Sequence, residues 1–434
     1  MNIDDLILVS IDDHLLEPPG MFDRHMPAAY QDRTPRLVRV NGTDAWSFEG
    51  RRYPLIGLNA VVGRPREEYG TEALNYDQMR PGCYEVAARV DDMNVNGVLA
   101  GMCFPTFPGF GGTTFLQVAD KAVALAAVRA YNDWHVHEWC GAAPGRFIPL
   151  GILPLWDIAL VVQEVERLVK LGVHAVTFPD NPSLHKLPSI HSDHWDPFWK
   201  VCADNRVVIN CHIGTGYQPP HASEDSPVDA WITAMPMAIA NSAADWTFAP
   251  MWRKFPALKM ALSEGGIGWI PYLLERADFT YEHHHAWTHS NFDSGRPSEV
   301  FKRHIITCFI DDRFGLKNRG DIGLDMITWE CDYPHSDCTW PQTPEILARS
   351  LEGLPQADID KVTHLNAMRE YSFDPFSILG RGNCTVRALR ARAAHVDTAP
   401  TLGLGGIAMR ERPGQVTSGD FKRQMERQFA GLQG

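Results

Sequence analysis

Polar side chains stand at the ends of several apolar runs in this sequence. They are carboxylates and imidazoles: Asp12, His14, His212, Glu264 and Asp332. Imidazole and carboxylate groups are the ligands that zinc, manganese and iron take from proteins, and a carboxylate also moves protons in catalysis. This set of residues predicts a metal-dependent active site, provided that the fold brings its members together.

The elements that must position these residues repeat as an apolar run followed by a helix. Helices are expected over 115–140, 157–171 and 268–284, and in the second of these apolar residues recur at spacings of three and four. Strands that alternate with helices are typical of a parallel sheet covered on both faces. Eight units predict a distorted (β/α)8 TIM barrel. A doubly wound open sheet is the alternative, but no GxGxxG motif follows the first strand. The expected strands span residues 6–12, 97–104, 147–154, 174–179, 207–213, 258–264, 304–310 and 326–332.

Side-chain alternation divides the polar end of the first strand between two sides. Asp12 and His14 point to one side, into the barrel, and Asp13 points to the other. Active sites of such barrels form at the carboxyl ends of the strands, so His212 and Asp332 can complete a site for one divalent cation. Two imidazoles and two carboxylates suit zinc best, and manganese or iron is the alternative. Taken singly, a histidine at a strand end is more often a hydrogen-bonded structural residue than a ligand, and an Asp shortly before a proline is often a turn former.

Two segments depart from the barrel pattern. Residues 30–80 contain Asn-Gly at 41–42 and Glu-Gly at 49–50, flanked by short strands, which predicts a β-hairpin insertion after strand one. We expect residues 1–376 to form the barrel with this insertion. Residues 377–434 are rich first in arginine and then in glycine and proline, and we expect an extension outside the barrel, either a dimer arm or a loosely held tail.

Composition limits the classes of partner. The chain has 434 residues, 44% of them hydrophobic, and a formal net charge of −13 without a dense basic run before its C-terminal segment, which disfavours nucleic acid. No run reaches the roughly 18 apolar residues of a membrane span. The acidic start lacks the basic residues of a signal peptide, and the nine cysteines form no CxxC pair. We therefore expect a cytoplasmic protein that acts on a small molecule.

Five motifs extend over nearly the whole predicted barrel: DDHLLEPPGMF (12–22), CHIGTG (211–216), LSEGGIGWIPYLLERAD (262–278), ECDYPHSD (330–337) and HLNAMREYSF (364–373). In order and spacing they resemble the amidohydrolase superfamily, in its amidohydrolase-related, aminocarboxymuconate-semialdehyde-decarboxylase-like branch. The resemblance implies one catalytic divalent metal, held by Asp12, His14, His212 and Asp332, and a homodimer or higher homo-oligomer. No lysine ends the run 174–179, so the bridging carboxylated lysine of binuclear relatives is absent.

One position departs from the family pattern. Many relatives carry a catalytic histidine where this chain has Glu264, which leaves a base, an extra ligand or a positioning group as its role. We assign Asp332, Glu264 and His212 to catalysis. Either carboxylate could handle the proton that replaces carbon dioxide in a decarboxylation, or remove a proton from the attacking water in a hydrolysis. A non-catalytic metal-binding barrel that serves as a scaffold is the alternative to both enzymes.

The expected substrate is a small aromatic or cyclic carboxylate. An apolar pocket with an arginine would suit such a molecule, because guanidinium groups bind carboxylates bidentately. Aromatic residues are also common in hydrophobic cores, so Phe104, Trp269 and Trp340 can equally be core residues. The residues expected to contact substrate are His335, Phe104, Trp269, Arg276 and Trp340.

Overall fold

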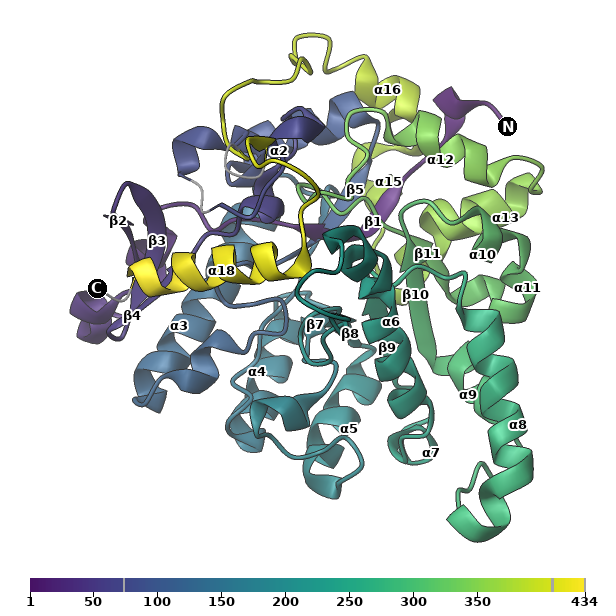
Figure 1. Cartoon of the computed structure of the whole chain (residues 1–434). Coiled ribbons are helices and arrows are strands. Elements are labelled where there is room, and N and C mark those ends of the chain that lie inside the picture. The colour runs from purple at the N-terminus through teal and green to yellow at the C-terminus, as the bar shows by residue number, and fades with distance from the viewer. Residues whose placement is uncertain (73–74, 407–409, 433–434) are drawn as a thin grey trace.

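The computed structural model describes residues 1–72, 75–406 and 410–432. Within these ranges, eight parallel strands lie at the centre in the order β6-β5-β1-β11-β10-β9-β8-β7 (Figure 1). Gly151 closes the ring: its amide donates to Ala175 O, and its carbonyl accepts from Thr177 N, both at 2.9 Å. The expected (β/α)8 barrel is therefore confirmed. Seven expected strands contain an observed one, and the first, expected over 6–12, overlaps a strand that begins at Val9 and continues to His14. The strands are β1 (Val9–His14), β5 (Ala100–Phe104), β6 (Phe147–Ile148), β7 (Ala175–Thr177), β8 (Val208–His212), β9 (Lys259–Ser263), β10 (Ile305–Phe309) and β11 (Ile327–Trp329).

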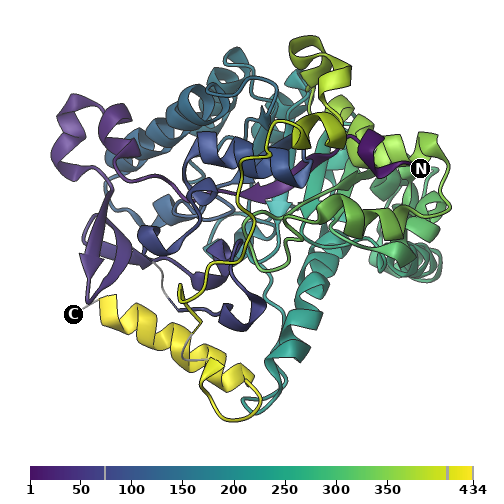
Figure 2. The same ribbon diagram turned by 90° about the horizontal axis from the view of Figure 1, so that it is seen from above.

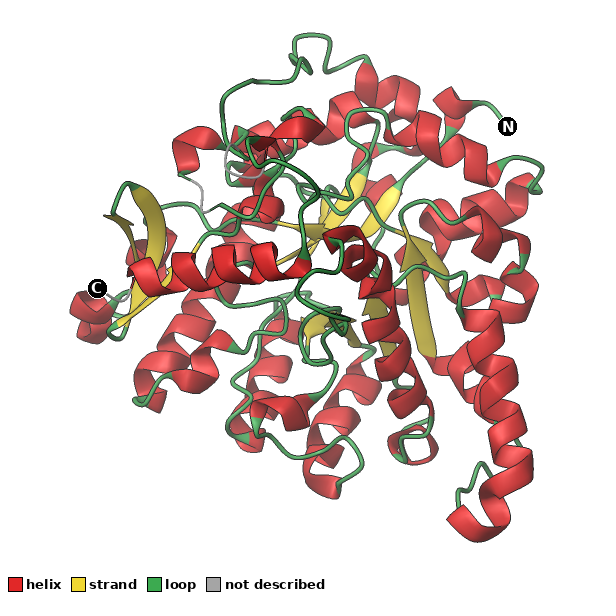
Figure 3. Cartoon of the chain, viewed as in Figure 1, coloured by secondary structure: helices red, strands yellow, loops and turns green. Residues whose placement is uncertain are grey.

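Helices surround the strands on the outside (Figure 3). In α4, Asp157 caps the first turn by accepting from two backbone amides, and Val161, Val165 and Leu168 form the buried face at helical spacing. The longer helices are α2 (Val86–Asn96), α3 (Lys121–Trp134), α4 (Ile158–Lys170), α5 (Asp196–Asn205), α6 (Val228–Thr247), α8 (Ile270–Thr288), α9 (Pro297–His304), α12 (Thr343–Leu351) and α18 (Ser418–Leu432). The shorter ones are α1 (Met21–His25), α7 (Met251–Lys254), α10 (Arg313–Lys317), α11 (Arg319–Ile322), α13 (Gln356–Asp360), α14 (Asn366–Glu370), α15 (Pro375–Leu379) and α16 (Val386–Arg390).

The insertion after β1 forms a sheet of its own. Among its described residues, β2 (Arg36–Val40), β3 (Thr43–Phe48) and β4 (Arg51–Pro54) pair antiparallel, so the expected hairpin has one strand more. Both expected turns are present: Asn41 and Gly42 have φ of 51° and 85°, and Glu49 and Gly50 have φ of 48° and 76°. Positive φ at both turn residues suits a two-residue hairpin loop, because its twist matches that of the strands.

The C-terminal segment folds back over its own barrel. Val386 in α16 donates its amide to Leu6 O at 2.9 Å, beside the N-terminus. The chain then runs to the opposite end, where α18 crosses the mouth of the barrel between β4 and α6 (Figures 1 and 2). The division at residue 376, the dimer arm and the homodimer stay predictions. No helix in the described part of the chain is long and apolar enough to cross a membrane.

The end of β1 is distorted where its polar residues begin. Its register with β5 shifts between Ser10 and Asp13. Asp13 turns toward β5, where a Cβ on Gly101 would lie 2.2 Å from Asp13 Oδ2. The carboxylate cannot move aside easily, because it is buried and accepts from Ser10 Oγ at 2.9 Å. Only glycine at position 101 leaves room for it.

We predict that Gly101→Ala destabilises the fold by about 1–3 kcal/mol, because the added methyl overpacks a buried carboxylate. Urea unfolding of the purified variant measures this. Gly320→Ala is the matched control, since a Cβ there meets nothing within 4 Å on a short exposed helix. Equal stability of the two variants would contradict the packing explanation.

Candidate metal and active site

The four expected metal ligands lie together at the carboxyl ends of the strands. His14 Nε2 lies 3.4 Å from Asp12 Oδ1 and 3.4 Å from Asp332 Oδ1. His212 Nε2, from the end of β8, lies 3.1 Å from His14 Nε2 and 3.5 Å from Asp12 Oδ2. All four side chains are buried. Their ligand atoms thus surround one point inside the mouth of the barrel.

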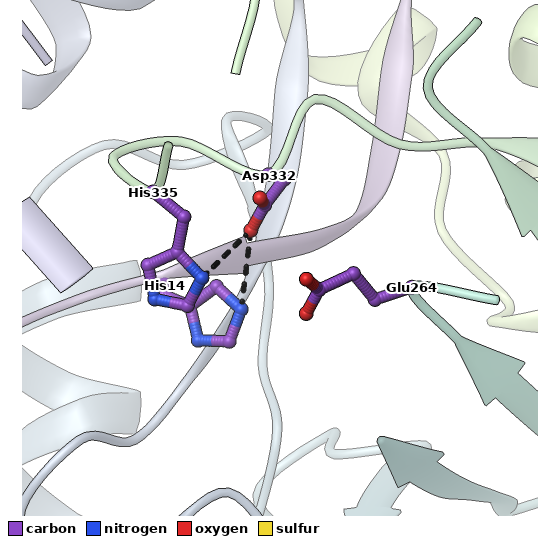
Figure 4. A group of neighbouring side chains, drawn as sticks. All are labelled: His14, Glu264, Asp332 and His335. Atoms are coloured by element: carbon purple, nitrogen blue, oxygen red, sulfur yellow. Dashed lines mark ion pairs between the residues drawn. The ribbon is translucent and has the colours of Figure 1, made fainter. Parts of the chain in front are cut away.

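Two further side chains approach the same point from the open side (Figure 4). Glu264 Oε2 lies 2.9 Å from His212 Nε2. His335 Nδ1 lies 3.0 Å from Asp332 Oδ1, and its ring stacks on that of His14 with centroids 3.6 Å apart. Ligand atoms of His14, Glu264, Asp332 and His335 all lie within 4.8 Å of one another, as a metal site requires.

An unusual backbone conformation directs the two carboxylates that follow β9 and β11. Glu264 and Asp332 have φ of 57° and 56°, in the left-handed region that residues other than glycine seldom adopt. Such residues persist where the surroundings hold them, and they cluster at functional sites. Here the Glu264 amide donates to Glu330 Oε2 at 3.1 Å, and the Asp332 amide donates to Asp12 O at 2.9 Å.

The buried polar groups of the site fit a cation. Neither oxygen of Asp12 or of Asp332 has a hydrogen-bond partner among the described residues. Burial raises the pKa of both carboxyl groups well above the usual range of an aspartate. Burial also lowers the pKa of His14 well below the usual range of a histidine. A divalent cation would favour the ionised carboxylates and the neutral imidazole, so these residues fit a metal.

The tautomer of His212 also suits a ligand. Its Nδ1 donates to Ile213 O at 2.7 Å, which leaves Nε2 directed at the site. Burial by itself would lower the pKa of His212, but the carboxylates of Asp12 and Glu264 raise it to about 9. The same imidazole therefore accepts either a proton or a metal ion at Nε2.

A second layer of contacts holds the strand ends. Asp13 faces away from the cluster and accepts from Tyr333 N at 3.3 Å as well as from Ser10. Glu17 accepts from the amides of Thr106 and Phe107 at 3.0 Å and 2.9 Å, and it thereby fixes the loop after β5. Glu17 supports that loop and makes no contact with the metal cluster.

A cavity of about 910 Å³ opens from the cluster toward solvent. Phe110 forms part of its wall, and its ring centroid lies 4.5 Å from that of His14 and 4.6 Å from that of His212. Sequence reasoning missed Phe110, although its place in the loop after an expected strand was a usable signal. Arg66 is the only arginine or lysine among the described residues that line this cavity.

Three of the expected substrate contacts lie in or behind a cavity of the site. His335 lines the 910 Å³ cavity, and Trp269 lines a neighbouring cavity of about 400 Å³ that shares Glu264 with it. Phe104 is buried behind the imidazoles, with its centroid 5.0 Å from that of His212.

Two of the expected substrate contacts, Arg276 and Trp340, line neither cavity. Arg276 is exposed on α8, and its guanidinium lies 5.0 Å from the centre of the Phe279 ring. The Trp340 indole donates to Asp92 O at 3.1 Å. The rotation of α8 and the packing of the loop after β11 decide these positions, and neither can be derived from residue type.

A closed parallel barrel with buried imidazoles and carboxylates at the carboxyl ends of its strands defines a metal-dependent barrel enzyme. The chain belongs to the amidohydrolase family, whose model matches residues 23–373. It is 28% identical over 240 residues to a gamma-resorcylate decarboxylase of Polaromonas sp., covering 50% of this chain and 68% of the relative. It is 21% identical over 308 residues to a 2-amino-3-carboxymuconate-6-semialdehyde decarboxylase of Dictyostelium discoideum, covering 69% of this chain and 80% of the relative. The expected branch of the superfamily is confirmed.

Solved structures show the same fold. An amidohydrolase from Mycobacterium avium subsp. paratuberculosis superposes with a TM-score of 0.64 at 21% identity, covering 84% of this chain and 99% of that one. A dihydroxybenzoic acid decarboxylase from Polaromonas sp., with bound manganese and the inhibitor 2-nitroresorcinol, has a TM-score of 0.55 at 19% identity, covering 84% and 96%.

We predict about one divalent metal ion per chain in the purified protein, falling at least tenfold in Asp332→Asn, because the variant loses a charged ligand. Elemental analysis of the dialysed protein measures this. Asp321→Asn is the control: this exposed carboxylate on α11 lines neither cavity and belongs to no metal-binding group of the described residues. Equal metal content in both variants would contradict the assignment of Asp332.

Proposed function

We propose that this protein is a metal-dependent, non-oxidative decarboxylase of an aromatic carboxylate that carries a hydroxyl group next to the carboxyl group. One observation carries the proposal: the buried carboxylates of Asp12 and Asp332 lack hydrogen-bond partners among the described residues. They belong to a cluster in which His212 and His335 line a cavity that has an aromatic wall. The two curated relatives described above, both named as decarboxylases, support this chemistry.

Asp12, His14, His212 and Asp332 are the residues proposed to hold the metal. When bound, a divalent ion would orient the two oxygen groups of the substrate and stabilise negative charge that develops on them. The ligand set of two imidazoles and two carboxylates suits zinc. The manganese bound in the Polaromonas structure supports manganese as the alternative.

The side chains around the cluster would position the ring and deliver the proton. Phe110 and His335 flank the cluster with rings 5.7 Å apart, and both line the cavity that would receive the substrate ring. Decarboxylation replaces a carboxyl group by a proton, so one residue must pass a proton to the ring carbon. Glu264 is proposed for this role, because its side chain is 15% exposed whereas those of Asp12 and Asp332 are fully buried. It can therefore exchange protons with water.

Hydrolysis is the second candidate, and Glu264 is the observation that favours it. The residue stands where many relatives of this superfamily carry a histidine, and its hydrogen-bonded partner His212 lowers its pKa although burial acts to raise it. An ionised carboxylate at this position would act as a base toward an attacking water molecule. Amide, ester and lactone substrates are therefore the competing class.

Turnover by the manganese- or zinc-loaded protein decides between the two reactions. We expect carbon dioxide release from gamma-resorcylate or from other hydroxybenzoates, measured by gas-phase mass spectrometry with carboxyl-labelled substrate. No release should occur with Asp332→Asn. If the loaded protein leaves every hydroxybenzoate intact but cleaves an amide or a lactone, hydrolysis is the function.

Glu264→Gln separates a proton-transfer role from a ligand role. We predict that this variant retains about one metal ion per chain and loses activity by about 10²–10⁴-fold, the usual contribution of a positioned acid or base. Metal content and kcat are measured on the same preparation. Loss of the metal together with the activity would identify Glu264 as a ligand instead.

A further inference from the structure

The outer part of the 910 Å³ cavity is built by the barrel helix α6 together with two segments added to the barrel, α18 and the insertion. Phe421 and Met425 of α18 line it on one side, and Trp231, Ile232 and Met235 of α6 line it beside them. Ile56 and Leu58 of the insertion contribute a third wall. Residues of α18 lie outside the 23–373 match to the family model. This chain therefore adds an apolar compartment to the metal site.

The helix that forms this wall is held at both ends. At its start, the amides of Ser418 and Gly419 donate to Ser226 O and Glu224 O, both at 2.8 Å, just before α6. Toward its other end, Gln428 Nε2 donates to Thr71 O at 2.5 Å, beside the insertion. Between these anchors α18 spans the barrel mouth as a strap (Figure 2). The wall is thus a fixed part of the cavity.

Apolar side chains of this compartment face open space. Ile232 is 43% exposed, and Phe421 and Met425 are half-buried although they lie in a concave site. The Phe421 ring packs against the Trp231 ring with centroids 4.9 Å apart, so the two walls meet at one edge. Contiguous apolar surface in a cleft marks a binding site for an apolar group.

The size of the cavity excludes a single ring as a full occupant. Sites that bury a drug-sized ligand have volumes of about 300–1,000 Å³, and this cavity lies near the upper limit. A hydroxybenzoate bound at the inner end, against His212 and His335, would leave the compartment between α6 and α18 empty. An apolar substituent on the ring would fill it.

We propose that the substrate carries an extended apolar substituent that lies between α6 and α18, and that Met425 and Ile232 determine its size. The inference rests on the proposed function only in placing the carboxyl end of the substrate at the metal cluster. Each methylene group that enters the compartment should improve affinity roughly fourfold, the value expected for transfer of a CH₂ group from water.

Equilibrium binding to the manganese-loaded protein tests this without requiring turnover. The probes are 2-hydroxybenzoate and its 4-propyl and 4-hexyl derivatives, and isothermal titration calorimetry gives Kd. We expect the hexyl compound to bind at least tenfold more tightly than the unsubstituted one. Met425→Trp fills the compartment from α18, and Ile232→Trp fills it from α6. In both variants the gain in affinity from the hexyl group should fall at least tenfold, while the Kd of 2-hydroxybenzoate stays unchanged.

Glu426→Trp is the matched control, because Glu426 is exposed on the same helix and does not line the cavity. It should retain the wild-type gain with chain length. Binding of 2-hydroxybenzoate without a gain for the longer compounds overturns this inference and leaves the proposed function standing. An unchanged gain in both tryptophan variants also overturns it. The inference is also overturned if none of the three probes binds. The measurement of carbon dioxide release then tests the proposed function independently.

Discussion

Two buried carboxylates that lack a hydrogen-bond partner among the described residues, those of Asp12 and Asp332, are the constraint around which the mouth of the barrel is organised. An ionised carboxylate in a dry interior is so costly that it either takes up a proton or binds a cation. His14 cannot supply the positive charge, because burial keeps its imidazole neutral. The positive charge comes from a protonated His212, whose pKa the carboxylates raise, or from a bound cation. This requirement ties the electrostatics of the fold to its chemistry.

The barrel meets this constraint by fixing both the strand ends and the first loop residues that follow them. Asp332 and Glu264 both adopt left-handed backbone conformations, and a hydrogen bond from the backbone amide holds each of them in place. On β1, the register shift and the missing side chain at Gly101 let Asp13 turn away while Asp12 faces the cluster. Sites built on strands are more rigid than sites on loops, which suits a ligand set that must close on one ion.

The segments added to the barrel act on the other half of the site. The insertion and α18 leave the metal cluster unchanged, and they wall the space in front of it. His212 and Glu264 at the strand ends contribute polar groups to the cavity, whereas α6 and α18 contribute mainly apolar side chains. The proposed reaction chemistry and the proposed substrate selection therefore lie in different parts of the chain. The residues that select the substrate can change without a change in the residues that carry the reaction.

The sequence by itself determined the eight strands, both turns of the inserted sheet and the shared side of Asp12 and His14. These features follow from local periodicity and turn chemistry, which depend on near neighbours in the chain. Only the tertiary structure decided that Phe110 flanks the imidazoles, that Arg276 points to solvent and that α18 closes the cavity. The rotation of a helix and the docking of a distant segment depend on packing between parts of the chain far apart in sequence. No local pattern encodes that packing.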